Sequence, residues 1–122
     1  MTEAQIIADR YVALWSETDA ERRRAGIHAF FAADAAHFIG TREAIGFAAL
    51  EQRIRSSHEK NVRDGGFRFR ARPGAQRLRN VVTFYWEMID PREGDRVTAV
   101  GLEFVTLNDD SRAILDYQFI LA

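Results

Sequence analysis

The sequence predicts an α+β fold in which three N-terminal helices pack on one face of a strongly curved, mostly antiparallel sheet. Apolar residues recur with helical spacing in the first half of the chain. After the glycine pair at 65–66 the pattern changes to alternation with a period of two, which is typical of strands. Short turns join the alternating stretches, and this favours antiparallel neighbours. The 122 residues are expected to form a single domain, 1–122.

Residues 3–16 form the first expected helix, because apolar side chains recur there at positions i, i+4, i+7 and i+8. Tyr11 and Trp15 belong to this stripe. Since they are separated by four residues, both side chains can lean over the same face of the sheet.

The second helix is expected over 18–32, where Thr18 and a glutamate three residues later have the spacing of a capping box. A short strand should follow at 34–39. Thr41 is then expected to cap a third helix over 42–57. Further strands are expected at 67–72, 75–90, 96–107 and 112–122.

Composition excludes several classes of function. Lys+Arg is 17 and Asp+Glu is 18, so the chain has no excess of basic residues. Binding to nucleic acid or to an anionic membrane surface is therefore not expected. The absence of cysteine excludes disulfides, thiolate nucleophiles and thiolate metal sites. No pair of histidines has ligand spacing, so neither a metal nor another cofactor is expected. Without a signal peptide or a long apolar stretch, a cytoplasmic protein is expected.

Four stretches together resemble a known family: "RYVALWSETDAERRRAGIHAFFAADAAHF", "GTREAI", "VTFYWEM" and "GLEFVTLNDDSRAILDYQF". They are similar to the SnoaL-like branch of the nuclear-transport-factor-2-like (NTF2-like) superfamily, which resembles ketosteroid isomerases and small polyketide cyclases. The resemblance covers nearly the whole chain and rests on a scattered pattern. It implies a cone that encloses an apolar pocket, and a homodimer formed through the outer sheet face.

The resemblance also implies roles for three positions. Tyr11 matches the helix-one tyrosine that holds an enolate in the isomerases. The general-base position falls at Ile39, and the late-strand acid falls at Phe104. Because a hydrocarbon side chain cannot exchange a proton, isomerisation by that apparatus is not expected here.

Alternation along each strand assigns its more apolar side chains to the concave face. Such a wall suits a planar apolar or aromatic molecule, although the same aromatics could simply fill the core. Glu103 and Asp116 would then point outward, unless a β-bulge turns one inward; Asp116 is the first to check. The expected pocket residues are Tyr11, Trp15, Phe84, Trp86, Met88, Leu102, Phe104, Tyr117 and Phe119.

His37 is the candidate for proton chemistry, because it shares the concave face with Ile39 and an imidazole titrates near neutral pH. The first interpretation is a cyclase- or isomerase-type enzyme acting on an aromatic or polycyclic carbonyl compound, with His37 and Tyr11 catalytic. The alternative is a non-catalytic ligand-binding or dimerisation domain, in which His37 is bonded to a buried partner.

Overall fold

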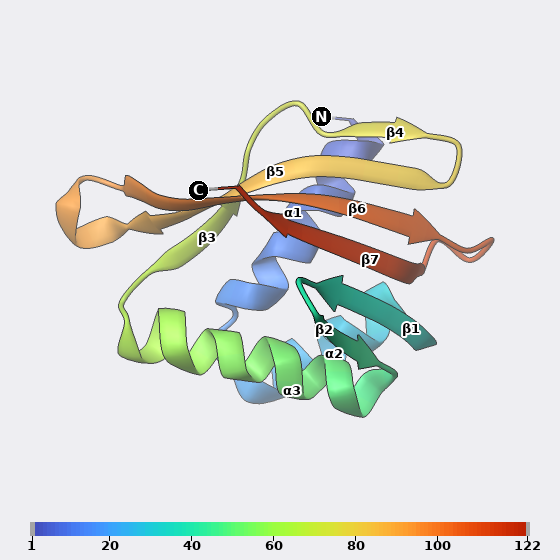
Figure 1. Ribbon diagram of the computed structural model, residues 1–122, viewed down its shortest axis with the longest axis horizontal. Coiled ribbons are helices and arrows are strands. Elements are labelled where there is room, and N and C mark those ends of the chain that lie inside the picture. The colour runs from blue at the N-terminus through green and yellow to red at the C-terminus, as the bar shows by residue number, and fades with distance from the viewer. Residues whose placement is uncertain (1, 122) are drawn as a thin grey trace.

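A computed structural model describes residues 2–121 and places one seven-stranded sheet against three α-helices (Figure 1). The helical elements are α1 (Glu3–Ser16), α2 (Ala20–Phe30), α3 (Phe47–Ser57), the π-helical turn η1 (His58–Asp64) that continues α3, and the 3-10 turn η2 (Pro91–Glu93). The strands are β1 (Phe31–Ile39), β2 (Arg42–Ile45), β3 (Arg68–Ala71), β4 (Gln76–Leu78), β5 (Val81–Asp90), β6 (Arg96–Leu107) and β7 (Ala113–Ile120). The predicted α+β class and its order, helices first, are confirmed.

The strand order in the sheet is β2-β1-β7-β6-β5-β3, and β4 adds to β5 beside β3. The predicted antiparallel meander of β5, β6 and β7 is confirmed. β7 also pairs with β1, and this contact is parallel. The last strand along the chain therefore lies in the middle of the sheet and joins the early hairpin β1–β2 to the meander (Figure 1).

Helix α1 packs across one face of the sheet, and the main hydrophobic core lies between them. Tyr11 is central to this core and is 1% exposed. Its ring meets those of Phe30, Phe31 and Phe84 edge-on, at centroid distances of 5.6, 6.3 and 5.4 Å. Such edge-to-face contacts stabilise aromatic cores beyond the area that they bury. The face of the sheet that is turned to α1 is called the inner face below.

Two predicted helix starts were wrong for local reasons. Residues 42–45 form strand β2 rather than the start of a helix, because the turn at Gly40, whose φ is +58°, folds them back onto β1. Helix α3 begins only after Gly46, whose φ of +86° suits glycine. Helix α2 is capped by Asp19, whose carboxylate accepts from the backbone N–H of Arg22 at 2.9 Å.

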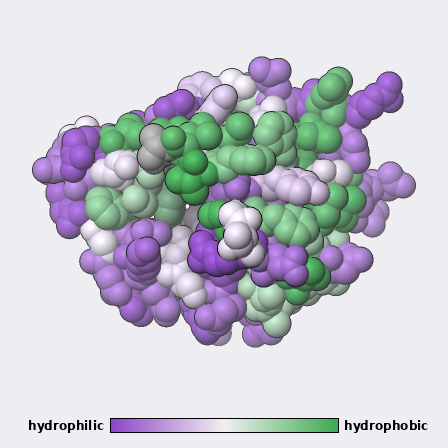
Figure 2. Space-filling view, viewed as in Figure 1, coloured by the Kyte–Doolittle hydropathy of each residue, from purple (hydrophilic) through white to green (hydrophobic). Residues whose placement is uncertain are grey.

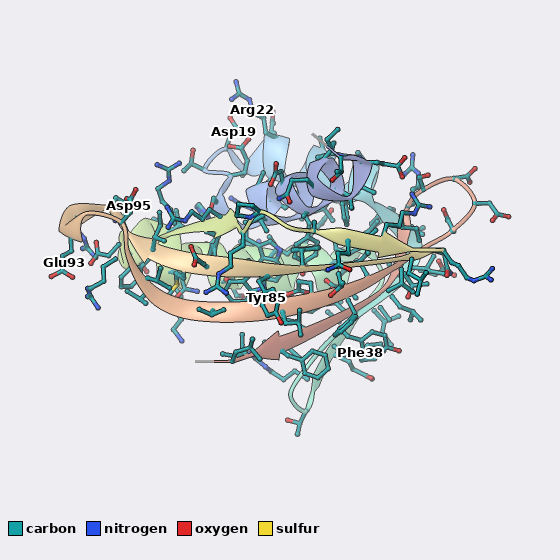
Figure 3. The ribbon with its side chains drawn as sticks, turned by 90° about the horizontal axis from the view of Figure 1, so that it is seen from above. Asp19, Arg22, Phe38, Tyr85, Glu93 and Asp95 are labelled. Carbon is teal, nitrogen blue, oxygen red and sulfur yellow. The ribbon has the colours of Figure 1, made fainter. Side chains whose placement is uncertain are left out.

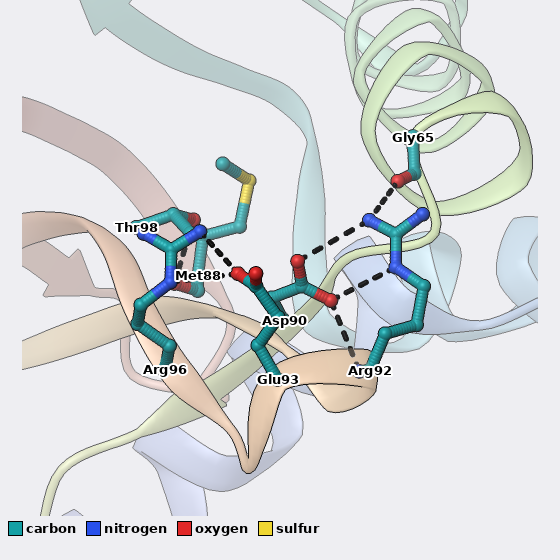
Figure 4. Close-up of polar contacts among 7 residues, drawn as sticks. All are labelled: Gly65, Met88, Asp90, Arg92, Glu93, Arg96 and Thr98. Atoms are coloured by element: carbon teal, nitrogen blue, oxygen red, sulfur yellow. Dashed lines mark hydrogen bonds and ion pairs between the residues drawn. The ribbon is translucent and has the colours of Figure 1, made fainter.

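The Arg92 side chain links the end of η1 to the β5–β6 hairpin (Figure 4). The Arg92 side chain donates to the Asp90 carboxylate at 2.9 Å and to the backbone carbonyl of Gly65 at 2.8 Å. Its guanidinium also lies over the Phe67 ring, 5.4 Å from the centroid. The helical segment that follows α3 is thereby held near the strands. Among residues 2–121, no helix is both long and apolar enough to span a membrane.

Candidate functional site

A cavity of about 400 Å³ opens between α1, the α3–η1 segment and the sheet. Its volume is within the range of small-molecule sites. The wall from α1 and the sheet is mainly apolar and is formed by Tyr11, Val12, Trp15, Ile39, Phe69, Trp86, Met88, Ala99, Gln118 and Ile120. The wall from β2, α3 and η1 is polar and is formed by Arg42, Arg53, Ser56, Ser57, Lys60 and Asn61.

A chain of hydrogen bonds lies behind the apolar wall, on the inner face. The Trp86 Nε1–H donates to Glu103 Oε1 at 2.9 Å. The Tyr11 hydroxyl is 3.1 Å from Glu103 Oε2 and 2.6 Å from Asp116 Oδ2. His37 Nδ1 is 2.7 Å from the same Asp116 oxygen. Glu103 and Asp116 are 0% exposed and His37 is 1% exposed, so these titratable groups share a site without water contact.

The geometry of this chain determines where its protons reside. A tyrosine hydroxyl has one hydrogen, so Tyr11 can donate to only one of the two carboxyl groups. The shorter contact, to Asp116, has the length expected for a bond from a hydroxyl to an ionised carboxylate. The contact with Glu103 is then satisfied if the Glu103 carboxylic acid donates to the Tyr11 oxygen. We therefore assign one proton to Glu103 and a negative charge to Asp116.

The electrostatic environment supports this assignment. Burial raises the pKa of Glu103 well above its ordinary value, and the nearby charge of Asp116 raises it further. Burial also acts to raise the pKa of Asp116, but its interactions with Glu103, His37 and Tyr11 outweigh this and lower it. Burial and the two carboxyl groups raise the pKa of Tyr11, which stays protonated. Two adjacent carboxyl groups are thus held in opposite protonation states.

Two buried polar atoms at the His37 end of the chain have no hydrogen-bond partner in the described part of the protein. Because an ionised carboxylate only accepts, His37 Nδ1 carries the hydrogen of its bond to Asp116. Its Nε2 is buried and has no partner within residues 2–121, and the same holds for Asp116 Oδ1. A carboxylate that orients an imidazole in this way is the arrangement by which many hydrolases prepare a histidine as a base.

Strand register brings these residues together from distant parts of the chain. In the parallel pair β1–β7, His37 lies opposite Asp116. In the antiparallel pairs, Phe84 lies opposite Glu103, and Glu103 lies opposite Gln118. Since opposed residues share a face, all of these side chains point toward α1, where Tyr11 meets them.

Gly101 makes room for the tryptophan of the chain. It lies opposite Trp86 in the β5–β6 pair, and a Cβ built at Gly101 would overlap the Trp86 indole ring. The ring therefore lies flat over the β6 backbone, which brings its N–H to Glu103 two residues further along. This close approach of a ring to a backbone requires glycine.

The prediction of which side chains face inward was wrong for β6 and β7. Phe104, Tyr117 and Phe119 are 38, 41 and 50% exposed and lie with Leu102 on the outer face, away from α1. The two faces of β6 and β7 are therefore the reverse of those predicted, and Glu103 and Asp116 point inward. An acidic side chain, Glu103, thus lies on the inner face one residue before Phe104, the position to which the resemblance assigned the late-strand acid.

The other predicted site residues lie on the inner side. Tyr11, Trp15, Trp86 and Met88 border the cavity. Phe84 is 2% exposed and belongs to the core. His37 lies one side-chain layer behind the cavity wall, where its ring is 5.7 Å from that of Trp15 between centroids. Sequence reasoning missed Arg53, Arg42 and Gln118 as cavity residues; their helical or alternating spacing gave no signal for them.

The same buried trio is the arrangement closest to a metal site in the described chain. Ligand atoms of His37, Glu103 and Asp116 lie within 4.8 Å of one another. However, hydrogen bonds to Tyr11 and Trp86 already engage both carboxyl groups, and His37 Nδ1 is bonded to Asp116. We therefore interpret the trio as a proton network.

Comparison with known proteins gives structural relatives. No family model and no curated protein matches the sequence. A candidate isomerase of the SnoaL-like family from Agrobacterium tumefaciens str. C58 is similar over 100% of both chains, with a TM-score of 0.87 and 25% sequence identity. An NTF2-like protein of unknown function from Exiguobacterium sp. 255-15 has a TM-score of 0.71 at 17% identity, over 94% of this chain and 98% of its own.

A third relative shares the fold at lower similarity. It is a candidate polyketide cyclase from Sinorhizobium meliloti, with a TM-score of 0.65 at 15% identity, over 93% of this chain and 94% of its own. The two weaker similarities concern the fold alone, whereas the Agrobacterium protein matches this chain from end to end. With its helices packed on the inner face of a curved sheet, the chain belongs to the SnoaL/NTF2-like superfamily.

Proposed function

We propose that this protein is an acid–base enzyme of the isomerase or cyclase kind, acting on a small aromatic or polycyclic carbonyl compound. One observation carries the proposal: the buried hydrogen-bond chain from Trp86 to His37 holds a protonated acid, Glu103, at one end and open acceptor atoms at the other. The isomerase and cyclase descriptions of the relatives from A. tumefaciens and S. meliloti agree with this class of reaction.

Two residues of the hydrogen-bond chain, Tyr11 and Trp86, border the cavity. The proposed chemistry begins at Tyr11. When a substrate binds, the Tyr11 hydroxyl exchanges its bond to Asp116 for one to the carbonyl oxygen of the substrate. The proton of Glu103 supports that hydroxyl as negative charge develops on the carbonyl oxygen. The proton on the carbon beside the carbonyl goes to the Asp116–His37 pair. The resulting enolate is reprotonated at another carbon in an isomerisation, or attacks a second carbonyl in a cyclisation.

Access to His37 requires movement of one side chain. Trp15 borders the cavity and lies against the His37 ring. Its Nε1 is buried and has no hydrogen-bond partner in the described range 2–121. Since no hydrogen bond from the side chain holds the indole in position, we propose that a small turn of the ring, which keeps its contact with Arg53, exposes His37 Nε2 when a substrate enters.

The cost of the network argues for a function. Removing titratable groups from water is unfavourable, and apolar residues of similar size would stabilise the fold at least as well. Groups that perturb one another in this way gather at active sites more often than elsewhere. The arrangement is therefore explained better by proton transfer than by stability.

The alternative is a non-catalytic ligand-binding domain. One observation favours it: His37, Glu103 and Asp116 do not border the cavity, and their hydrogen bonds are largely satisfied among themselves. In that case the network would only fix α1 to β6 and β7.

Exchange of carbon-bound protons separates the two interpretations without knowledge of the natural substrate. The probe is 2-tetralone in D₂O, with loss of the proton signal beside its carbonyl followed by NMR. We expect wild-type protein to accelerate exchange, and Glu103→Gln and His37→Gln to reduce that acceleration by about 10²–10⁴-fold, as for a lost acid or base. Arg22→Gln is the control, because Arg22 lies on the exposed side of α2, away from the sheet (Figure 3).

Folding must be checked in the same samples. Glu103→Gln keeps a neutral group that can donate to Tyr11 and accept from Trp86, so its melting temperature should stay near that of the wild type. If the probe binds but wild type and Glu103→Gln exchange it equally fast, the non-catalytic interpretation replaces the enzyme.

We also propose that the protein forms a homodimer through the outer sheet face. Hydrophobic side chains gather on this face, over the central strands (Figure 2). The exposed ones include Phe104, Tyr117 and Phe119. Phe38 stacks on Tyr117 at a centroid distance of 5.2 Å, and Phe104 meets Phe119 edge-on at 6.0 Å. Phe38 and Tyr85 lie on the side of the sheet opposite α1 and α2 (Figure 3). A contiguous apolar patch of this kind marks an interaction surface, and a two-fold contact covers it with a second copy.

Sedimentation tests the dimer. Wild type should sediment as a dimer at roughly tens of micromolar, where a standard interface holds. Tyr117→Glu should sediment as a monomer. Leu78→Glu is the control, since Leu78 is 77% exposed on β4, outside the central strands. A monomeric wild type would contradict the proposal.

A further inference from the structure

The two walls of the cavity differ in charge. The lining from α1 and from strands β1, β3, β5, β6 and β7 carries no cation. Three cations come from the rest of the lining: Arg53 on α3, Lys60 on η1, and Arg42 at the β2 edge of the sheet. Arg53 lies on α3 and is partly buried, while Arg42 on β2 and Lys60 on η1 are exposed. Their arrangement gives the cavity a positive side that faces an aromatic one.

These cations lack nearby counter-ions. Several arginines elsewhere in the chain are closely paired: Arg70 and Arg72 both contact Glu87 at 2.9 and 2.8 Å, and Arg92 contacts Asp90. Within residues 2–121, none of the three cavity cations forms an ion pair with a carboxylate. The ionised Asp116 attracts Arg53 from a greater distance, but a single buried carboxylate leaves the cavity with excess positive charge.

Arg53 is held in a position to bind an anion. Its Nη2 donates to Gln118 Oε1 at 3.2 Å, and its guanidinium lies over the Trp15 ring, 4.9 Å from the centroid. These contacts fix the plane of the guanidinium. Its Nε is buried and has no partner among the residues described. Burial lowers the pKa of Arg53, and the like charge of Arg42 lowers it further, so a bound anion would relieve both effects.

We propose that the molecule bound in this cavity carries a carboxylate, which sits on Arg53 with Arg42 and Lys60 at the entrance, while its planar part lies against Trp15 and Trp86. A guanidinium matches the planar fork of a carboxylate better than an ammonium does. That this molecule is a substrate rests on the proposed function: an aromatic carbonyl acid held by its carboxylate would bring its carbonyl group toward Tyr11.

A matched pair of probes tests the charge alone. The acid 2-naphthoate and its neutral amide, 2-naphthamide, have almost the same shape, and quenching of tryptophan fluorescence reports their binding. Wild type should bind naphthoate about 10-fold more tightly than naphthamide or better, the size expected for a hydrogen bond to a charged group. Arg53→Gln should weaken naphthoate binding by about 10-fold and leave naphthamide binding within about 2-fold.

Two further variants protect the test against misfolding of Arg53→Gln. Arg42→Gln and Lys60→Gln change exposed side chains, and each should weaken naphthoate binding by about 2- to 5-fold, with a smaller effect at high salt. Arg22→Gln removes the same charge far from the cavity and should bind both probes as wild type does. The salt dependence separates attraction at the entrance from a change in the fold.

Several outcomes would overturn the inference. Equal affinities for the two probes would do so, as would no binding of naphthoate up to about 1 mM. An equal loss in Arg22→Gln and Arg53→Gln would show an effect of net charge alone. Unchanged naphthoate binding in a destabilised Arg53→Gln would show that Arg53 serves only the fold, through its contacts with Gln118 and Trp15. Because the assay measures binding, a preference for naphthoate without proton exchange would refute the proposed enzyme but leave this inference standing.

Discussion

The inner and outer faces of the sheet reverse the usual placement of side chains. On the inner face, Glu103 and Asp116 are completely buried. On the outer face, Phe104, Tyr117 and Phe119 are at least 38% exposed. Buried polar groups and exposed apolar patches are the two departures from the common pattern that carry information. They occur on alternate residues of the same strands, which is consistent with the two proposals made above: proton chemistry on the inner face and contact with a second copy on the outer face.

The largest expected effect comes from removing the charge at the centre of the inner face. Asp116→Ala takes away the acceptor of both Tyr11 and His37, and leaves their buried donors without a partner. We expect a loss of about 3–5 kcal/mol in the free energy of unfolding, measured by urea denaturation. If Asp116→Ala unfolds at the wild-type urea concentration, the network does not have the hydrogen bonds described.

Replacing Gly101 should cost less, because it perturbs packing rather than a charge. The added methyl group of Gly101→Ala overlaps the Trp86 ring, which must shift away from Glu103. Overpacking of this kind costs roughly 1–3 kcal/mol. The emission maximum of Trp86 in a Trp15→Phe background should shift. An unshifted maximum with wild-type stability would argue against the flat placement of the ring.

The pH dependence of stability should distinguish Glu103 from an ordinary carboxylate. Its folded-state pKa lies above the ordinary value of 4.5, so the folded state keeps a proton that the unfolded state releases. The wild type therefore loses stability as the pH rises from about 4.5 toward the folded-state pKa. Between about pH 5 and pH 8, the melting temperature should fall more steeply for wild type than for Glu103→Gln. Parallel curves would contradict a protonated Glu103.

The smallest effect on stability should occur on the outer face. Phe104 is 38% exposed, and Phe104→Gln removes no hydrogen bond. Measured in dilute protein, where a dimer has dissociated, its free energy of unfolding should stay within about 0.5 kcal/mol of wild type. A loss of several kcal/mol would show that Phe104 belongs to the core of a single chain and that the two faces are less different than described.

The architecture could be predicted from periodicity because the spacing of apolar residues along a helix or strand is a local signal. It does not depend on which distant residues the element contacts. The three helices, the change near Gly65 and the last two strands follow from local spacing, whereas the expected strand 75–90 is divided into the antiparallel pair β4 and β5. Strand β2 was missed because residues 42–45 also suit a helix. Gly40 and Gly46, both with positive φ, bound this segment and were the available signal.

The site could be predicted only in part because its energetics depend on partners from other elements. The more apolar side of a strand is normally the buried one, because a polar side chain without a partner is costly to bury. We therefore chose the more apolar sides of β6 and β7 as the inner ones. Here Tyr11 and His37 satisfy Asp116, so the polar side is the buried one. Since a shift of one residue turns every side chain of a strand to the other face, this single choice exchanged the whole set.

The central position of β7 has a consequence for the order of folding. The bonds from Asp116 to His37 and to Tyr11 join residues 79 and 105 positions apart. Contacts of such long range form slowly, because a large loop must close before they contribute. Until β7 inserts, β1 and β6 present unpaired edges, and such edges invite aggregation. A nascent chain therefore acquires its protected sheet and its buried hydrogen-bond network in the same late step, and a chaperone that shields those edges would act before that network forms.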